Sequence, residues 1–385
     1  MKNVSILGST GSVGSSTLNL IERRREHFRV IGLAAGKSIP TLLEQAKKFR
    51  PKIVCLGRRE EAAEFRKLLK DRSVRVTFGP EGAEEIAGFE ENDIVVSAIT
   101  GIDGLRPTLA AVEAGKKIAL ANKESMVVAG QLIQKKAARS RARIIPVDSE
   151  HSGVFQCLAK EQKRSILKVI LTASGGPFFK TPLSRMREKT LEETLNHPRW
   201  KMGKKVTVDS ATLMNKGLEL IEARWLFNLS PGQLDVLIHP QSVVHSLVEL
   251  KGGSVLAQLS LTDMRIPILY ALTYPQREDS FLPALELDKV GKLEFFKVDE
   301  GRFPLFALAR KALEEGDSFP VALNAANEVV VGAFLRGEIG FAEIAGLVRR
   351  VVECHHKKKA ESLADIFEVD GDTRRQTWNL LKQRS

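Results

Sequence analysis

The sequence predicts an α/β fold in three parts: a doubly wound parallel sheet, a central α/β part with a mostly antiparallel sheet, and a C-terminal helical bundle. Three observations support this. Short apolar runs alternate with amphipathic segments up to about residue 150. The strand-like segments that follow alternate apolar and polar residues, as in sheets with one open face. From Leu305 onward the pattern is helical throughout. A chain of 385 residues is also too long for one ordinary core.

The N-terminal part, residues 1–150, reads as a series of βαβ units. Segments 15–24, 39–49 and 105–114 have helical periodicity and separate apolar runs that are short enough for strands. Because strands spaced by helices pair in parallel, we expect one doubly wound sheet. The predicted strands are Val4–Leu7, Val30–Ala35, Ile53–Leu56, Val74–Phe78, Ile94–Ile99, Lys117–Ala121 and Ile144–Val147.

The rest of the chain divides by composition into three stretches. Residues 151–275 form the predicted central part, with strand candidates at 236–250 and 254–261. Residues 276–303 contain Pro283, are flanked by Pro275 and Pro304, and show little helical periodicity, so they read as a linker. Residues 304–385 form the predicted helical part, with helices at 305–314, 322–336 and 341–354.

Charge and composition narrow the class of partner. The net charge of +12 is spread along the chain, its densest runs, such as Lys357–Lys359, hold only three consecutive basic residues, and only 6% of residues are aromatic. This favours small anionic ligands over nucleic acid. No apolar stretch approaches the roughly 20 residues of a membrane-spanning helix. An N-terminus that enters a strand-like run at once, and three distant cysteines (Cys55, Cys157 and Cys354) that fit reduced, buried thiols, predict a cytoplasmic protein.

A glycine pattern follows the first predicted strand. Gly8, Gly11 and Gly14 lie at the spacing G-x-x-G-x-x-G and open a predicted helix. Glycines let the backbone approach a pyrophosphate, and the amides at the helix N-terminus then bind it. A structural tight turn is the alternative. The strand-turn-helix context favours a dinucleotide site.

The residues after the second predicted strand indicate which dinucleotide binds. NAD enzymes usually place an acid there to bind the ribose 2′-hydroxyl. This chain has no acid between Arg29 and Ile39, and it has Lys37 and Ser38 instead. A lysine and a hydroxyl suit a 2′-phosphate, so we predict a Rossmann-like, NADP(H)-binding domain. A solvated surface lysine is the alternative, but it leaves the missing acid unexplained.

Two acids follow the last strand of the N-terminal part. Asp148 and Glu150 are two residues apart and would point the same way if the chain stayed extended. Facing carboxylates repel unless a cation lies between them. Mg²⁺ or Mn²⁺ suits oxygen ligands, whereas zinc would favour Cys or His. By themselves, these acids could equally be solvated loop residues.

A polar helix face strengthens the metal hypothesis. Ser210 precedes a predicted helix, and Asn215, Lys216 and Glu219 share one face of it because they are three and four residues apart. Such a face could offer a carboxylate to a metal and an amide and an ammonium to a phosphate. An ordinary exposed face is the alternative, but the other positions of this helix are mostly apolar.

Three further segments carry polar groups. Ser174 begins a Ser-Gly-Gly turn that could form an anion nest, or a plain structural turn. His197, Trp200 and Met202 lie in a basic connector that reads equally well as a ligand-closing lid or as a packed loop. His239 and His245 would share a strand face, but two ligands do not make a zinc site, so packed histidines are the preferred interpretation.

Together, these segments resemble the 1-deoxy-D-xylulose 5-phosphate reductoisomerase family. The motifs that carry the resemblance occur in order over most of the chain, and coverage is weakest at 276–320 and after 340. They are GSTGSVG at 8–14, ALANKES at 119–125, PVDSEHS at 146–152, TASGGPF at 172–178, HPRWKMG at 197–203, VDSATLMNKGLELIEARWLF at 208–227, HPQSVVHS at 239–246 and ALNAANE at 322–328.

The resemblance implies a V-shaped homodimer and a role for each matching position. It implies one divalent metal ion (Mg²⁺, Mn²⁺ or Co²⁺) and NADPH as cofactors, and a small phosphorylated sugar as substrate. Asp148, Glu150 and Glu219 match the metal ligands. The positions matching substrate contacts are Lys123, Ser149, Glu150, Ser174, His197, Ser210, Asn215, Lys216 and Glu219. Those matching cofactor contacts are Thr10, Gly11, Ser12, Val13, Gly36, Lys37, Asn122, Glu124 and Gly203, with Ser38 beside them.

The implied reaction is a rearrangement of 1-deoxy-D-xylulose 5-phosphate followed by reduction to 2-C-methyl-D-erythritol 4-phosphate, a step of non-mevalonate isoprenoid synthesis. Lys123 would donate to the developing oxyanion. Two departures from the family pattern concern only fine geometry: Ala173 stands where some members have glycine, and Ser38 where some have asparagine. Two rivals remain, namely an NADP-dependent dehydrogenase without the rearrangement and a non-catalytic NADP(H)-sensing regulator.

Overall fold

The computed structural model describes residues 1–200 and 202–383 and contains two compact units. Unit 1 comprises residues 1–125, 133–152 and 263–283. Unit 2 comprises residues 126–132, 153–262 and 284–385. Each unit therefore draws on separate stretches of the chain. The three-part division of the sequence remains a prediction.

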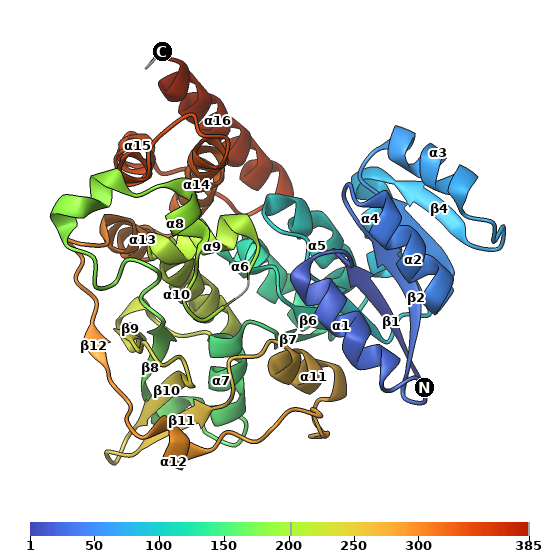
Figure 1. The fold of residues 1–385 in the computed structure, drawn as a ribbon, viewed down its shortest axis with the longest axis horizontal. Coiled ribbons are helices and arrows are strands. Elements are labelled where there is room, and N and C mark those ends of the chain that lie inside the picture. The colour runs from blue at the N-terminus through green and yellow to red at the C-terminus, as the bar shows by residue number, and fades with distance from the viewer. Residues whose placement is uncertain (201, 384–385) are drawn as a thin grey trace. The chain divides into compact units, whose positions relative to one another are not determined.

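Unit 1 is built on a seven-stranded parallel sheet of order β4-β3-β2-β1-β5-β6-β7 (Figure 1). The order reverses between β1 and β5, which makes their carboxyl ends the switch point where doubly wound sheets bind ligands. All seven strands predicted from the apolar runs are present. They are β1 Lys2–Leu7, β2 Phe28–Ala34, β3 Ile53–Leu56, β4 Arg75–Phe78, β5 Ile94–Ser97, β6 Lys117–Leu120 and β7 Arg143–Pro146.

Helices link these strands. The first begins at Ser12, three residues before its predicted start, so that Gly14 lies inside the helix. Two helices, α6 and α7, contribute residues to both units, and α6 is kinked at Ala129. The helices are α1 Ser12–Glu22, α2 Ile39–Phe49, α3 Arg59–Leu68, α4 Gly79–Gly88, η1 Ile102–Gly104, α5 Leu105–Glu113, α6 Lys123–Ser140, α7 Ser149–Cys157 and α11 Arg265–Thr273.

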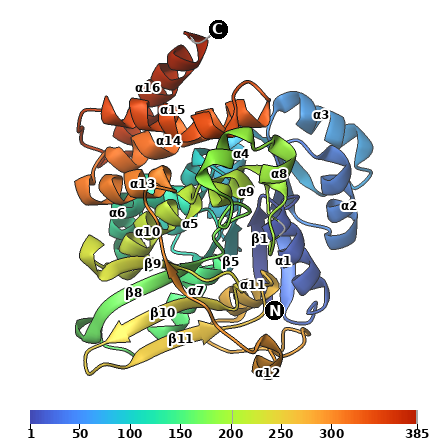
Figure 2. The same cartoon turned by 60° about the vertical axis from the view of Figure 1, so that its left-hand side comes forward.

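Unit 2 contains a five-stranded sheet of order β11-β10-β8-β9-β12 (Figure 2). Only the β8–β9 pair is parallel, so the sheet is mostly antiparallel, as predicted. The strand candidate at 236–250 is in fact two strands with a loop at 239–243 between them, and the predicted linker contributes the edge strand. The strands are β8 Ile166–Ala173, β9 Leu234–Ile238, β10 Val244–Leu250, β11 Val255–Leu259 and β12 Phe296–Lys297.

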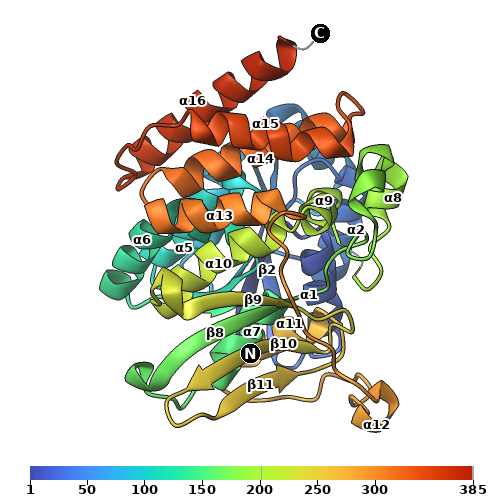
Figure 3. The ribbon, with the colours of Figure 1, turned by 90° about the vertical axis from the view of Figure 1, so that its left-hand side faces the viewer.

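In unit 2, the helix α14 packs against α9, α13, α15 and α16 (Figure 3). Because α14 is covered on most sides, it is apolar nearly all round rather than amphipathic. The helices are η2 Lys163–Ser165, η3 Leu183–Glu188, α8 Leu191–Leu195, α9 Lys204–Ala211, α10 Met214–Phe227, η4 Pro231–Gln233, α12 Leu287–Val290, α13 Pro304–Glu315, α14 Phe319–Leu335, α15 Phe341–Glu353 and α16 Leu363–Lys382.

Two simple properties of the chain complete the description. Among the described residues, no helix combines the length and the apolar character that crossing a membrane requires. All three cysteines are free thiols. Cys55 is buried as predicted, but Cys354 is exposed, because it ends α15 where the chain turns into the loop before α16.

Candidate active site

The glycine loop joins β1 to α1 by a very close backbone turn. Gly8 has φ +85°, and a Cβ there would lie 2.5 Å from the carbonyl oxygen of Ala98. A Cβ on Gly14 would lie 2.3 Å from the carbonyl oxygen of Gly8. No side chain fits at either position. The loop therefore exposes backbone at the carboxyl end of β1. Of the four predicted cofactor residues here, Thr10 and Gly11 lie in the loop, and Ser12 and Val13 begin α1.

The second predicted cofactor segment is the turn after β2. Lys37 is exposed there, and the Ser38 hydroxyl donates to Thr41 Oγ1 at 2.9 Å. A Cβ on Gly36 would meet nothing within 4 Å. The ammonium of Lys37 is therefore open to an anionic ligand in unit 1, close in sequence to the end of a strand next to β1.

The segment after β6 is held by an asparagine. Asn122 caps α6, since its Oδ1 accepts the Ser125 N–H at 3.0 Å. Its amide donates to the Ile99 and Gly101 carbonyl oxygens and to Glu124 at 3.0 Å. Gly101 follows β5, so Asn122 ties together the ends of two strands at the switch point. This leaves Asn122 and Glu124 buried parts of the local structure.

Lys123 and the acids after β7 meet within unit 1. The Lys123 ammonium donates to Asp148 Oδ2, and both side chains are at most 15% exposed. Asp148 and Glu150 offer oxygens within 4.8 Å of each other. The expectation of an extended chain here is wrong, because α7 begins at Ser149. Helix formation, rather than strand pleating, brings the two carboxylates together.

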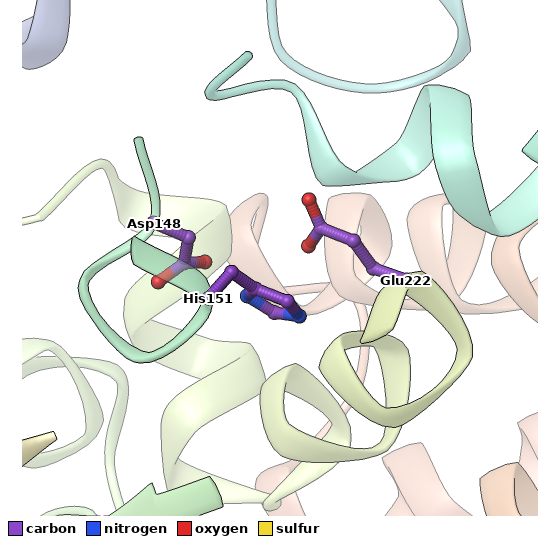
Figure 4. Close-up of side chains that lie close together, drawn as sticks. All are labelled: Asp148, His151 and Glu222. Carbon is purple, nitrogen blue, oxygen red and sulfur yellow. The ribbon is translucent and has the colours of Figure 1, made fainter. Parts of the chain in front are cut away.

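His151 is a residue of this segment to which the sequence analysis gave no role. It is fully buried, and one ring nitrogen lies within 4.8 Å of an Asp148 oxygen. Figure 4 shows the His151 ring beside Asp148 at the start of α7, and also draws Glu222, a buried residue of α10. His151 belongs to the quoted DSEHS motif, so its position beside two acids was the signal available.

In unit 2, the predicted polar face of α10 is present. Asn215 Nδ2 and Lys216 Nζ donate to opposite carboxylate oxygens of Glu219, each at 2.5 Å. Lys216 is 4% and Glu219 1% exposed, so an ordinary solvated face is excluded. A Cβ on Gly217 would lie 2.3 Å from the Cβ of Ala309, which shows how tightly α10 packs on α13. The Glu219 carboxylate is therefore buried, and the Asn215 amide and the Lys216 ammonium both donate to it.

The Ser-Gly-Gly turn after β8 is bonded to the connector that begins at His197. The backbone N–H of Trp200 donates to His197 Nδ1 at 2.8 Å. The proton of the neutral His197 ring is therefore on Nε2, which lies 3.0 Å from Ser174 Oγ. Ser174 Oγ also accepts from the Gly176 N–H at 3.1 Å. Burial lowers the pKa of His197 to about 4, so the ring is neutral near pH 7. The Ser174 hydroxyl keeps its own hydrogen for donation.

The connector between α8 and α9 packs on β10. The rings of Trp200 and His245 lie 6.2 Å apart, and burial lowers the pKa of His245 to about 4. Met202 is half-buried and Gly203, a predicted cofactor contact, is exposed in this unit. Lys201 lies outside the described residues. His239 stacks on Phe295 at 4.8 Å, so the packed interpretation holds for both histidines.

Ser210 precedes α10, as predicted, and itself lies in the last turn of α9. A Cβ on Gly176 would meet the Ser210 carbonyl oxygen at 2.6 Å, so the turn after Ser174 touches the end of α9. Sequence reasoning missed the preceding residue, Asp209, whose side chain is 1% exposed and pairs with Lys205 at 2.9 Å. An acid at the position before a predicted phosphate-binding serine was the only signal.

Comparisons with known proteins cover nearly the whole chain. Three family models match. Residues 4–130 match 1-deoxy-D-xylulose 5-phosphate reductoisomerase, residues 144–227 its C-terminal domain, and residues 259–376 the DXP reductoisomerase C-terminal domain. Proteins named 1-deoxy-D-xylulose 5-phosphate reductoisomerase from Chlorobium phaeobacteroides and Pelotomaculum thermopropionicum are each 48% identical, over 96% of this chain and 96% of their own.

Solved structures agree. A DOX-P reductoisomerase in complex with NADPH, fosmidomycin and magnesium superimposes with a TM-score of 0.94 at 40% identity, over 99% of this chain and 98% of that one. The 1-deoxy-D-xylulose 5-phosphate reductoisomerase of Zymomonas mobilis in complex with NADPH gives 0.92 at 39% identity, over 99% of both chains.

Proposed function

This chain belongs to the 1-deoxy-D-xylulose 5-phosphate reductoisomerase family, and on that premise we propose how its residues serve that activity. The enzyme is an NADP-dependent oxidoreductase that rearranges and reduces 1-deoxy-D-xylulose 5-phosphate to 2-C-methyl-D-erythritol 4-phosphate, with NADPH and one divalent metal ion. The feature that best supports the chemistry is the buried Asn215–Lys216–Glu219 cluster, which a dehydrogenase without the rearrangement would not need.

NADPH would be held by the switch-point residues of unit 1. The backbone of the glycine loop can approach a pyrophosphate because no side chain fits at Gly8 or Gly14. The exposed Lys37 and the neighbouring Ser38 would bind the 2′-phosphate. The remaining proposed contacts are Thr10, Gly11, Ser12, Val13, Gly36, Asn122 and Glu124 of unit 1, together with Gly203, which belongs to unit 2.

The divalent metal would be held by three carboxylates: Asp148, Glu150 and Glu219. Their donor set fits a hard cation such as Mg²⁺, because every ligand atom is an oxygen. Asp148 and Glu150 have oxygens within 4.8 Å of each other, a spacing at which two carboxylates repel without a nearby positive charge. Lys123 supplies such a charge to Asp148, and Lys216 supplies one to Glu219. Each of these two acids therefore has an ammonium group beside it.

The substrate phosphate would lie at four residues of unit 2, called here the phosphate cluster: Ser174, Ser210, Asn215 and Lys216. Hydroxyl, amide and ammonium groups all donate to phosphate oxygens, and ionised pairs make the strongest of these bonds. Ser174 accepts two hydrogen bonds from the protein and so directs its own hydrogen outward. Ser149 and His197 would complete the substrate contacts.

The chain's own groups then serve the reaction by positioning, proton supply and exclusion of water. When bound, the metal supplies Lewis-acid polarisation and NADPH supplies the hydride. Lys123, which is 8% exposed, would donate to the oxygen on which negative charge develops. The connector bearing His197, Trp200 and Met202 would cover the substrate as a lid. It would keep water from the aldehyde intermediate that lies between the rearrangement and the reduction.

A single assay tests the proposal. NADPH oxidation is followed with 1-deoxy-D-xylulose 5-phosphate, with and without Mg²⁺, and the product is identified by NMR. We expect turnover that a chelator abolishes and added metal restores, and a branched product. Metal-independent oxidation, or reduction without a branched skeleton, would instead identify a plain NADP-dependent dehydrogenase. NADPH binding without turnover of this substrate would favour a sensing role.

The proposal extends to assembly and compartment. Members of the family are expected to be homodimers, and sedimentation of this chain with and without ligands tests that expectation. A cytoplasmic location is supported by the absence of disulfides among its three cysteines, as a reducing compartment requires.

A further inference from the structure

A buried polar contact joins α9 to α14, and the proposed chemistry has not used it. Asn327 of α14 donates its Nδ2–H to Asp209 Oδ1 at 2.8 Å. The other oxygen of Asp209 pairs with Lys205 at 2.9 Å. All three residues belong to unit 2, and Asn327 is fully buried. The bridge Lys205–Asp209–Asn327 thus links the first turn of α9, its last turn and the middle of a core helix.

This bridge is the means by which α9 is oriented on α14. A buried carboxylate is costly unless it is paired, and each oxygen of Asp209 has one partner here. Rotation or sliding of α9 would separate Asp209 from Asn327 and leave a buried charge with only one partner. The position of α9 is therefore fixed by a directional bond as well as by apolar packing.

The helix that the bridge orients carries Ser210 near its C-terminal end and follows the proposed lid at its N-terminal end. Asp209 directly precedes Ser210, one of the phosphate cluster, and the carbonyl of Ser210 lies against the turn at Gly176. At the other end, Lys205 follows Gly203, where the proposed lid ends. A shift of α9 would move the Ser210 hydroxyl and the end of the lid together.

The chemistry of Asn327 suggests a purpose beyond stability. Its Oδ1 is buried and has no hydrogen-bond partner among the described residues. Leaving a buried carbonyl unsatisfied is unfavourable, so an apolar side chain would serve the core better. An amide is nevertheless present, and its one hydrogen bond is to Asp209.

We propose that Asn327 is a positioning residue for the phosphate end of the substrate, acting through Asp209 on α9 and Ser210. This rests on the proposed function. The helix α14 is in turn anchored to α16. Arg374 of α16 pairs with Glu328 of α14 and with Asp370 of its own helix. The C-terminal helices thereby help to hold the phosphate cluster without touching the substrate.

A matched pair of variants tests the proposal. Asn324 lies three residues earlier on α14, is equally buried and also has an unpartnered Oδ1, but its amide donates to Glu328 and not to α9. Asn327→Leu and Asn324→Leu therefore remove the same group from the same helix. We expect Asn327→Leu to raise KM for the sugar phosphate about tenfold or more, with KM for NADPH within about twofold of wild type. Asn324→Leu should leave both KM values near wild type, even where the Tm values of the two variants fall equally.

Binding of inorganic phosphate, measured by titration calorimetry, gives a readout that needs no turnover. Asn327→Leu should raise the Kd for phosphate by about the same factor as it raises KM for the sugar phosphate. Asn324→Leu should leave the Kd for phosphate near wild type. If the wild-type protein fails to turn over the sugar phosphate, but Asn327→Leu still binds phosphate more weakly than Asn324→Leu, the proposed function is wrong and the positioning role stands. Equal phosphate affinities and equal KM values in the two variants would overturn the positioning role.

A reversal of the bond provides the rescue. Asn327→Asp places a second carboxylate against Asp209 and should lose phosphate affinity more severely than Asn327→Leu. Adding Asp209→Asn restores one N–H to carboxylate bond with its direction reversed. We expect the double variant to recover most of the lost affinity and KM. A double variant no better than Asn327→Asp alone would show that the bond does not position α9.

Discussion

Two regions of this chain are proposed to bind phosphates, and they are built from different groups. The cofactor loop of unit 1 presents backbone, because Gly8 and Gly14 leave no room for side chains. The phosphate cluster of unit 2 presents side chains, and its buried Lys216 is paired with Glu219 in the absence of ligand. The first lies within one turn of the sequence, whereas the second is gathered from segments near residues 174, 210 and 215.

The difference predicts how each region fails. A backbone site depends on local conformation, so it should be insensitive to most side-chain changes and sensitive to an added Cβ. A side-chain site depends on charge and on the packing of distant helices, so single charge changes should have large effects. Variants of each region test that contrast.

The metal hypothesis makes Glu219 the most sensitive residue of the side-chain region. Glu219→Gln keeps the shape but removes a charged ligand, so kcat should fall at least about 100-fold while the Kd for NADPH stays near wild type. A steep loss of turnover, together with an unchanged Kd in a fluorescence titration with NADPH, would support the assignment of Glu219 as a metal ligand. If turnover and metal affinity are both retained, Glu219 is not a metal ligand.

Lys216 tests the phosphate cluster through a competing ligand. A short compound with a hydroxamate at one end and a phosphonate at the other should bind both subsites and compete with the sugar phosphate. Lys216→Ala should weaken it about ten- to a hundredfold, because a charge-assisted contact contributes about 1.5–3 kcal/mol. The phosphonate-free analogue is the control and should be nearly unaffected. Equal losses for both compounds would place Lys216 elsewhere.

The backbone region is tested by two glycines of the same loop. Gly14→Ala would place a Cβ 2.3 Å from the Gly8 carbonyl oxygen, so the turn must shift, at a cost of about 1–3 kcal/mol. NADPH affinity and the Tm of the ligand-free protein should both fall. A Cβ on Gly11 has its nearest neighbour at 3.3 Å, so Gly11→Ala should leave the ligand-free Tm near wild type. Equal Tm values in the two variants would contradict the steric argument.

Lys37 is the one side chain of the backbone region expected to matter for specificity. Lys37→Ala should raise KM for NADPH about tenfold and barely change KM for NADH, because only NADPH carries the 2′-phosphate. Lys47→Ala removes another exposed lysine, in the last turn of α2, and serves as the control. The same factor for both cofactors would end the 2′-phosphate assignment.

His197 gives the smallest effect and a pH dependence. Its pKa is lowered to about 4 in the folded chain, against about 6.5 when unfolded, so its contribution to stability is present above pH 6.5 and is lost as the pH falls toward 4. Between pH 7 and 5, wild type should lose about 1–2 kcal/mol more unfolding free energy than His197→Gln. Denaturant titrations measure this. Parallel losses would mean that the imidazole titrates normally.

Much of unit 1 could be predicted from the sequence, because its signals are local. The apolar run Ile53–Leu56 matches its strand residue for residue, and helix 39–49 has the predicted ends. The glycine loop and the missing acid before Lys37 also need only neighbouring residues. In α10 the spacing of Asn215, Lys216 and Glu219 fixes a shared face, which the structure confirms.

Predictions failed where a residue's partner lies far away in the sequence. The chain at Asp148 was expected to be extended, yet α7 begins there, and a single acid pair carries no signal for helix or strand. The segment 236–250 was read as one strand, but residues 239–243 form a loop, in which His239 stacks on Phe295. The helix predicted at 322–336 is α14 at 319–335, and it is not amphipathic, because other helices bury it on most sides.

The sequence by itself determined the doubly wound sheet, the family and the kinds of group that the site contains, since these follow from periodicity, short motifs and residue chemistry. Only the tertiary structure decided which groups face each other. Asn327 and Asp209 are 118 positions apart, and nothing in either segment predicts their hydrogen bond. Ser174 and His197 likewise meet only through the connector's path. Long-range pairing depends on how helices pack, and packing is decided by all the surfaces in contact rather than by any one segment.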